Sequence, residues 1–341
     1  MRTFVVVVLT LATLSPTATA APTGPVHRIT DQIARDLAAG LADTTTRARI
    51  TNAVLTSPTH LADLGLAGPL ATKIVTAERR LATAKGLPES KLLTIRLGHE
   101  KMADQLRAGA LPKIAAAPDD DRAVTFTAYG TDGRKQLPTA QVSDEPVLLV
   151  DVDVERAVTL GMNVLRQVLP APAVSATAAG YWATKIARVR VSDVQEPWFK
   201  GDAEIFSLVT GFGLDGKVRV DTVTMPYLDE ENTTYYPNQL LVHWNAYKYD
   251  LADVVMMEDD GDTNYRALAQ AIATALLTIV DGGAYIPLVD AILGAIPDSW
   301  YTDDPDYVES WYTLAEQGSG VLNGASARGW IDTVPYFVRE F

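Results

Sequence analysis

Cysteine is absent from the 341 residues of this chain, and histidine occurs only four times. Without cysteine, the protein has no disulfide bond, no thiol nucleophile and no cysteine-ligated zinc. No two histidines show metal-ligand spacing, and His99-Glu100 lacks the second histidine of the zinc-protease motif. No Gly-x-Ser-x-Gly motif, phosphate-binding loop or dinucleotide fingerprint occurs either. The sequence signatures of a zinc protease, a serine hydrolase or a nucleotide-binding enzyme are therefore missing.

Basic residues are scarce in the C-terminal half. Residues 21–180 hold 18 basic and 17 acidic side chains, whereas residues 181–341 hold 10 basic and 25 acidic ones. Such an excess of acids repels nucleic acid, whose binding requires Lys and Arg against phosphate. It suits either cation binding or a solvated surface. We therefore expect no nucleic-acid partner, and an extracellular or cell-envelope ligand whose identity the sequence does not give.

One long hydrophobic run is present, and it lies at the N-terminus. Arg2 precedes the apolar residues 4–14, and residues 18–21 read Ala-Thr-Ala-Ala. This order is typical of a secretory signal peptide, with cleavage predicted near Ala20. The run is too short for a transmembrane helix, which needs roughly 20 residues. We therefore expect a secreted protein with no transmembrane segment in its mature chain, a retained membrane anchor being the alternative.

The hydrophobic period changes along the N-terminal half. Residues 21–115 repeat apolar side chains every three or four positions, which predicts a helical region. Residues 116–168 contain alternating segments and an Asp-Gly turn at 132–133, which predicts a small β unit. Residues 169–180 combine two prolines with small side chains, which predicts a linker between domains.

The C-terminal residues 181–341 predict an acidic antiparallel β-sandwich. Residues 184–191 alternate polar and apolar side chains, and four further segments before residue 258 have strand character. Helical periodicity follows in residues 265–280 and 285–296, with two glycines between them, which predicts a helical hairpin packed on the sheet. The predicted fold class is thus α+β: a helical N-terminal region, a small β unit and an antiparallel β-sandwich with a packed helical hairpin.

Acidic residues concentrate in the loops of the predicted sandwich. The densest run, residues 258–264, reads Glu-Asp-Asp-Gly-Asp-Thr-Asn. Crowded carboxylates repel one another, and a calcium ion, which takes about six to eight oxygen ligands, removes that repulsion. The run is not an EF-hand, because Tyr265 and Ala271 occupy the positions of its glycine and its last glutamate. The predicted calcium ligands are Asp193, Glu196, Glu258, Asp260 and Asp262.

The acidic loops also allow simpler interpretations. Asp, Asn and Gly form turns for local reasons, so these loops can be plain solvated turns. Asp262 or Asn264 would also make a good N-cap for the helix that follows. A further acidic cluster, Asp229-Glu230-Glu231, lies beside an Asn-x-Thr sequon at residues 232–234. The aromatic residues of this half are typical either of sheet faces or of a carbohydrate or peptide platform.

Four blocks in the C-terminal half carry a family resemblance. They are residues 196–205 (beginning Glu-Pro-Trp), 225–229 (Met-Pro-Tyr-Leu-Asp), 234–239 (Thr-Tyr-Tyr-Pro-Asn-Gln) and 257–265 (beginning Met-Glu-Asp-Asp). These blocks resemble motifs of a family of secreted bacterial proteins known only as a domain of unknown function. The resemblance implies secretion and a shared fold, and it implies no activity.

The sequence supports one main functional hypothesis and two alternatives. The main hypothesis is a secreted calcium-dependent binding module built on the acidic β-sandwich, which favours binding over catalysis. The first alternative is a secreted hydrolase that uses a carboxylate pair or a bound metal, although no pair of acids is singled out. The second alternative is a metal-free interaction protein of the cell envelope.

Overall fold

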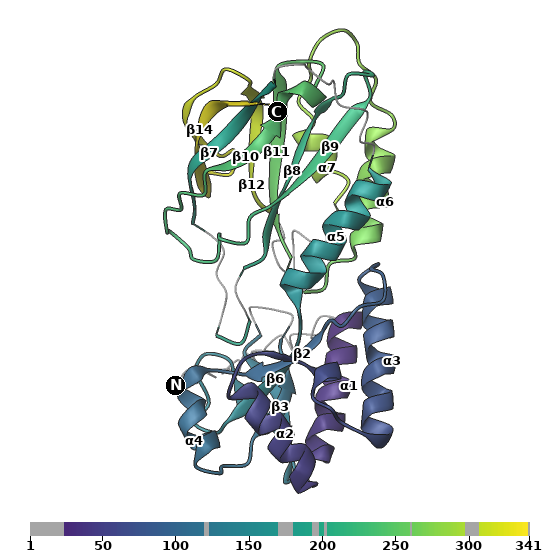
Figure 1. The fold of residues 1–341 in the computed structure, drawn as a ribbon, viewed down its shortest axis with the longest axis vertical. Coiled ribbons are helices and arrows are strands. Elements are labelled where there is room, and N and C mark those ends of the chain that lie inside the picture. The colour runs from purple at the N-terminus through teal and green to yellow at the C-terminus, as the bar shows by residue number, and fades with distance from the viewer. Residues whose placement is uncertain are drawn as a thin grey trace, which may run out of the picture.

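The computed structural model describes residues 24–118, 123–169, 180–192, 198–200, 203–259, 261–296 and 307–339. The predicted signal peptide and nearly all of the predicted linker lie outside these residues. Within them the chain forms two lobes stacked along the long axis (Figure 1). Helices and antiparallel strand pairs occur together, so the predicted α+β class is confirmed.

The first lobe is built on a six-stranded sheet in the order β1-β2-β6-β3-β4-β5. All neighbouring strands run antiparallel except β3 and β6, which are parallel. The strands are β1 (Thr59–His60), β2 (Leu93–Leu97), β3 (Lys113–Ala116), β4 (Thr125–Gly130), β5 (Gly133–Pro138) and β6 (Val147–Val152). The helices of this lobe are α1 (Pro25–Gly40), α2 (Thr44–Val54), α3 (Gly68–Ala84) and α4 (Ala103–Arg107).

Helix α1 covers one face of this sheet with its apolar stripe. Ile29, Ile33 and Leu37 recur every four residues and are buried at 4% exposure or less. This spacing puts them on one face of the helix, which packs on β3 and β6. The opposite face of the sheet carries a second cluster that includes Phe126 and Phe199.

The second lobe is a β-sandwich of two four-stranded antiparallel sheets, in the orders β10-β7-β14-β13 and β12-β11-β8-β9. Ile186, Val254 and Trp311 belong to the apolar core between the sheets. The first sheet contains β7 (Tyr181–Val191), β10 (Gln239–His243), β13 (Gly320–Asn323) and β14 (Gly329–Val338). The second contains β8 (Ile205–Phe212), β9 (Val218–Thr224), β11 (Leu251–Glu258) and β12 (Tyr307–Ala315).

Helices cover the outer face of the second sheet (Figure 1). They are α5 (Val154–Val168), α6 (Tyr265–Leu276) and α7 (Val289–Leu293). Strand β8 is buried along its whole length because the sandwich core lies on one side and these helices on the other. The helical hairpin is shorter than the sequence predicts. Residues 277–288 form an irregular connection, in which Leu277 and Val280 are 81% and 79% exposed.

Some elements differ from the secondary structure expected of their segments. Strand β2 lies inside the region predicted to be helical, β3 begins in it, and both strands pair with β6. In β2, Leu93 and Ile95 alternate with Thr94 and Arg96, which is a strand period rather than a helical one. Helix α5 lies inside the predicted β unit and packs against α6 of the second lobe. The described helices include none that is long and apolar enough to cross a membrane.

Candidate functional site

A cleft of about 340 Å³ opens between the two lobes. The first lobe contributes residues of α1, β1 and β2 and the end of β6, and the start of α5 adds Glu155. The second half of the chain contributes Lys200, Glu204 and the acidic loop that follows β11. Strand β6 ends at Val152 and α5 begins at Val154, so a single residue joins the two elements at the edge of the cleft.

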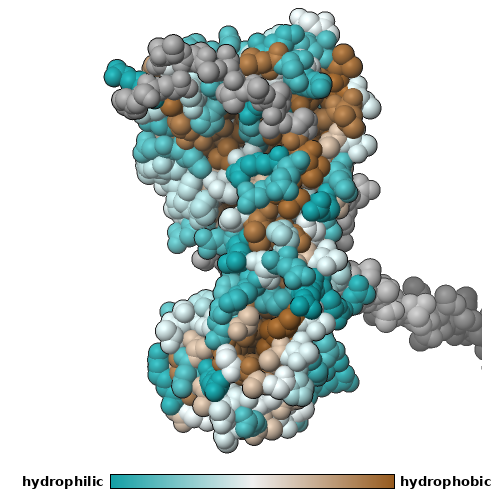
Figure 2. All heavy atoms as spheres, turned by 45° about the vertical axis from the view of Figure 1, so that its right-hand side comes forward, coloured by the Kyte–Doolittle hydropathy of each residue, from teal (hydrophilic) through white to brown (hydrophobic). Residues whose placement is uncertain are grey.

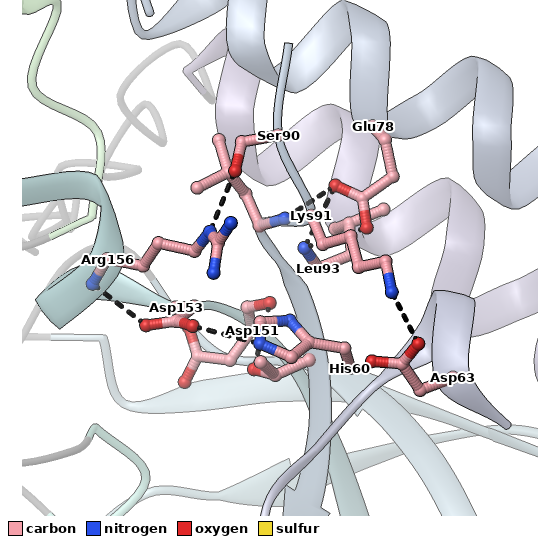
Figure 3. Close-up of polar contacts among 11 residues, drawn as sticks. His60, Asp63, Glu78, Ser90, Lys91, Leu93, Asp151, Asp153 and Arg156 are labelled. Carbon is pink, nitrogen blue, oxygen red and sulfur yellow. Dashed lines mark hydrogen bonds and ion pairs between the residues drawn. The ribbon is translucent and has the colours of Figure 1, made fainter. Parts of the chain in front are cut away.

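That joining residue, Asp153, is held by both of its carboxylate oxygens (Figure 3). Its Oδ1 accepts a 2.9 Å hydrogen bond from the backbone N–H of Arg156, which caps the N-terminus of α5. His60 Nε2 lies 3.2 Å from its Oδ2. The Arg156 guanidinium in turn donates to Ser90 Oγ at 2.7 Å. The start of α5 is therefore fixed to the first lobe by two side-chain contacts.

The surroundings of His60 Nδ1 indicate whether the His60–Asp153 pair is suited to proton transfer. Nδ1 is buried and has no hydrogen-bond partner in the described part of the chain. A general base needs a nitrogen within reach of a substrate or nucleophile. The orientation of His60 thus suits the fixing of Asp153 better than proton transfer.

A second ion pair lies in the wall of the same cleft. Arg96 Nε and Nη2 donate to Asp151 Oδ2 at 3.3 and 3.1 Å, and Nη2 also donates to the backbone oxygen of Phe199 at 2.6 Å. Arg96 and Asp151 come from adjacent strands, β2 and β6, whereas Phe199 comes from a segment between β7 and β8. Arg96 therefore ties that segment to the first lobe.

The acidic loop predicted to bind calcium is tied to α3 through Asp259. Lys85 Nζ donates to the Gly261 carbonyl at 2.7 Å and lies 3.3 Å from Asp259 Oδ2, and both charged side chains are 0% exposed. Asp259 also accepts hydrogen bonds from the Tyr265 hydroxyl and the Gly261 backbone N–H. Because Lys85 compensates its charge and its oxygens are occupied, Asp259 is not available as a metal ligand.

Asn264 connects α6, which it caps, to the end of α3. Its Oδ1 accepts from the Ala267 N–H at 2.9 Å, which confirms the predicted N-cap of α6, and its Nδ2 donates to the Ala84 carbonyl at 2.8 Å. Gly86, just after α3, has φ +63°, and a Cβ there would lie 2.5 Å from Asn264 Oδ1. Only glycine fits this close approach.

The five predicted calcium ligands fall into two groups. Glu258, at the end of β11, is 7% exposed, and Asp262 is exposed at the cleft. The other three, Asp193, Glu196 and Asp260, lie outside the described residues. Among the residues that the structure describes, no three His, Asp or Glu side chains converge so as to hold a metal ion. The calcium site stays a prediction.

The cleft nevertheless gathers acids that the sequence scatters. Asp262 and Glu204 of the second half share its lining with Asp151, Asp153 and Glu155 of the β6–α5 junction. Asp259 is the sixth carboxylate, and Arg96 and Lys200 are the permanent cations of the described lining. Figure 2 shows hydrophilic residues gathered at the narrow waist between the lobes. A concave, predominantly acidic lining raises the local concentration of cations.

Sequence reasoning missed the contribution of the first lobe. Asp151 and Asp153 follow the apolar run of β6 at alternate positions, a signal that could have placed both acids at the end of a strand. His60 carried no signal, because β1 is only two residues long.

Two buried carboxylates away from the cleft accept hydrogen bonds from backbone N–H groups. The Glu309 carboxylate accepts from the backbone N–H groups of Ser310, Ser326, Arg328 and Gly329. Asp253 accepts from Leu288 and Thr313, and burial raises the pKa of its carboxyl group. These acids hold loops together, and neither offers a free carboxylate for catalysis.

Comparison with known proteins agrees with the resemblance seen in the sequence blocks. A family model described as "Protein of unknown function (DUF3103)" matches residues 24–340, nearly the whole chain. Searches of curated proteins and of solved structures find no match. The chain therefore belongs to the DUF3103 family of proteins of unknown function.

Proposed function

We propose that this protein is exported and binds a positively charged ligand in the cleft between its lobes, with calcium as the first ligand to test. The observation that carries the proposal is the lining of the cleft, where Asp262 and Glu204 of the second half lie with Glu155 at the start of α5. A cation bound there would contact both lobes. Its binding would therefore stabilise their present arrangement.

Two kinds of cation, a metal ion and an organic cation, could bind to these carboxylates. Calcium needs about six to eight oxygen atoms, which would come from Glu258 and Asp262 together with the predicted ligands Asp193, Glu196 and Asp260. An ammonium or guanidinium group needs only two or three carboxylates. The cleft volume of about 340 Å³ lies at the lower end of the range for small-molecule sites. A small organic cation is therefore the second ligand to test.

The hydrolase alternative has one observation in its favour, the His60–Asp153 contact. Three features of the cleft weigh against it. His60 Nδ1 is buried, Asp151 is engaged by Arg96, and the Thr94 hydroxyl donates to the backbone oxygen of Asp151 rather than to a base. Binding is thus the function that the geometry supports better.

The experiment is thermal unfolding of the mature chain with calcium, magnesium, free arginine or a chelator. A ligand at one hundred times its Kd adds about 2.7 kcal/mol to the free energy of unfolding. Asp262→Asn should reduce the shift, whereas Asp104→Asn, a change at a side chain that is 93% exposed on α4, should leave it intact. A shift with calcium alone supports the metal, and a shift with arginine alone supports an organic cation. The absence of any shift contradicts the proposal.

A further inference from the structure

Two of the sequence blocks that carry the family resemblance, 225–229 and 234–239, converge away from the cleft. They line an open groove on the β-sandwich lobe. Three tyrosines and two prolines dominate its walls: Pro226, Tyr227, Tyr235, Tyr236 and Pro237. None of these residues lines the inter-lobe cleft, so the groove is a separate surface. We call it the Tyr–Pro groove.

Two of the three rings are held in fixed positions. The Tyr227 hydroxyl donates to Gln239 Oε1 at 2.6 Å, and Gln239 Nε2 donates to the Thr224 carbonyl at 2.8 Å. The rings of Tyr227 and Tyr235 lie 6.0 Å apart between centroids, with an angle of 50° between their planes. A rigid aromatic wall loses little conformational entropy when a ligand binds.

Tyr235 is fixed by its side chain and by its backbone. Its hydroxyl donates to Asp229 Oδ1 at 2.6 Å and accepts from the Glu230 N–H at 2.9 Å. Burial and the Asp229 carboxylate raise the pKa of this hydroxyl to about 12, so it stays protonated at neutral pH. Its backbone N–H and carbonyl both bond to Val189 of β7. The polar groups of Tyr227, Tyr235 and Gln239 are thus occupied within the protein. The two rings pack partly on the sandwich core, and the parts that line the groove remain for a ligand.

Tyr236 is the exposed element of the groove. Its side chain is 66% exposed, although it lies between the fixed Tyr235 and Pro237. A large aromatic side chain that protrudes beside an aromatic wall is typical of a recognition surface rather than of a core.

The charge beside the groove selects among ligands. Asp229, Glu230 and Glu231 form the turn that the Tyr235 hydroxyl holds. This acidic edge repels anionic glycans and anionic lipid surfaces and attracts Lys or Arg. A neutral sugar would need free hydrogen-bonding groups, whereas Gln239 and two of the three tyrosine hydroxyls already have partners. Proline rings need only aromatic faces, and an extended proline-rich segment is already ordered before it binds.

We propose that the Tyr–Pro groove binds an extended proline-rich peptide segment that carries a basic residue next to its prolines. The prolines pack against Tyr227, Tyr235 and Tyr236, and the basic side chain pairs with the acidic turn of residues 229–231. This interaction does not depend on ligand binding in the inter-lobe cleft.

The test is fluorescence anisotropy of the mature chain with a labelled peptide of alternating proline and leucine that ends in arginine. Tyr236→Ala should weaken binding by at least about tenfold, the effect of losing one central aromatic contact. The matched control is Tyr336→Ala on β14, which removes a tyrosine that is 45% exposed at a different site. Circular dichroism establishes that both variants are folded.

Two changes to the peptide make the test independent of the variants. Replacing the terminal arginine by glutamate should weaken binding several-fold, and replacing the prolines by alanine should abolish it. Binding that survives both changes overturns the proposal. So does the absence of binding at roughly millimolar peptide, or the binding of a neutral oligosaccharide that Tyr236→Ala abolishes while the peptide does not bind.

Discussion

Lys85 and Asp259 form a completely buried ion pair between the end of α3 and the loop that precedes α6. The two residues are 174 positions apart in the sequence. Each belongs to a segment that binds the other through its backbone, since the Tyr265 N–H donates to the Lys85 carbonyl at 3.0 Å. The most acidic loop of the protein therefore joins the two lobes through Asp259. This attachment also holds the acids beside it, such as Asp262, at the cleft.

Removal of one partner of this pair should be strongly destabilising. Lys85→Met leaves the Asp259 carboxylate buried without its cation, which costs about 3–5 kcal/mol. Equilibrium unfolding in urea measures the loss. Lys73→Ala, which breaks the exposed Lys73–Asp36 pair, is the matched control and should cost less than about 1 kcal/mol. Equal losses in both variants would contradict the account.

The packing of α5 on α6 depends on a glycine. A Cβ at Gly161 would lie 2.2 Å from the ring of Tyr265, which is fully buried. Gly161→Ala should therefore destabilise the protein by about 1–3 kcal/mol through overpacking. A Cβ at Gly282 meets nothing within 4 Å, so Gly282→Ala should have little effect. The melting temperatures of the two variants test this contrast, and a Gly161→Ala protein as stable as the wild type would refute it.

Asp153, the single residue between β6 and α5, caps the helix, so its replacement should lower the stability of the protein. Asp153→Ala removes the acceptor for the Arg156 N–H and the contact with His60, and should cost about 1–2 kcal/mol. Asp153→Asn keeps an oxygen at the cap and should lose less. Hydrogen exchange of the first turn of α5, compared between the two variants, reports the fraying. Identical exchange in both would show that the cap does not matter.

Asp281 should make the stability depend on acid pH. The Lys248 ammonium group, the Tyr249 hydroxyl and the Gly283 N–H lower the pKa of its carboxyl group to about 2. Because this value lies below the ordinary 3.8, the contribution of Asp281 is present above about pH 4 and is lost as the pH falls towards 2. The stability difference between wild type and Asp281→Asn should shrink over that interval. A difference that is constant from pH 2 to pH 6 would exclude this assignment.

Local patterns predicted the elements that local physics controls. The apolar stripe of α1 and the cap of α6 at Asn264 follow from periodicity and capping chemistry, and the structure has both. Helix α5 was missed although its signals exist, with Asp153 at the N-cap and Val158, Met162 and Leu165 on one face. The alternating segments and the Asp-Gly turn at 132–133 instead predict a β unit that extends to residue 168.

Contacts between distant segments left no such signal. Nothing in the neighbourhood of Lys85 or Asp259 indicates that the two meet, because their pairing arises from the stacking of the lobes. The same holds for Arg96, which reaches a backbone oxygen 103 residues away. The acidic loop could therefore be found from composition, whereas its partner in the first lobe and the cleft beside it could not.

The central claim is that the acids of the cleft bind a cation, and calorimetric titration of calcium into the mature chain tests it most directly. The account predicts heat of binding with one saturable site, which Asp262→Asn weakens and Asp104→Asn does not change. Free arginine titrated in the same way distinguishes an organic cation from the metal. If neither titrant binds, or if both variants bind as the wild type does, the cleft is not a cation site and the account is contradicted.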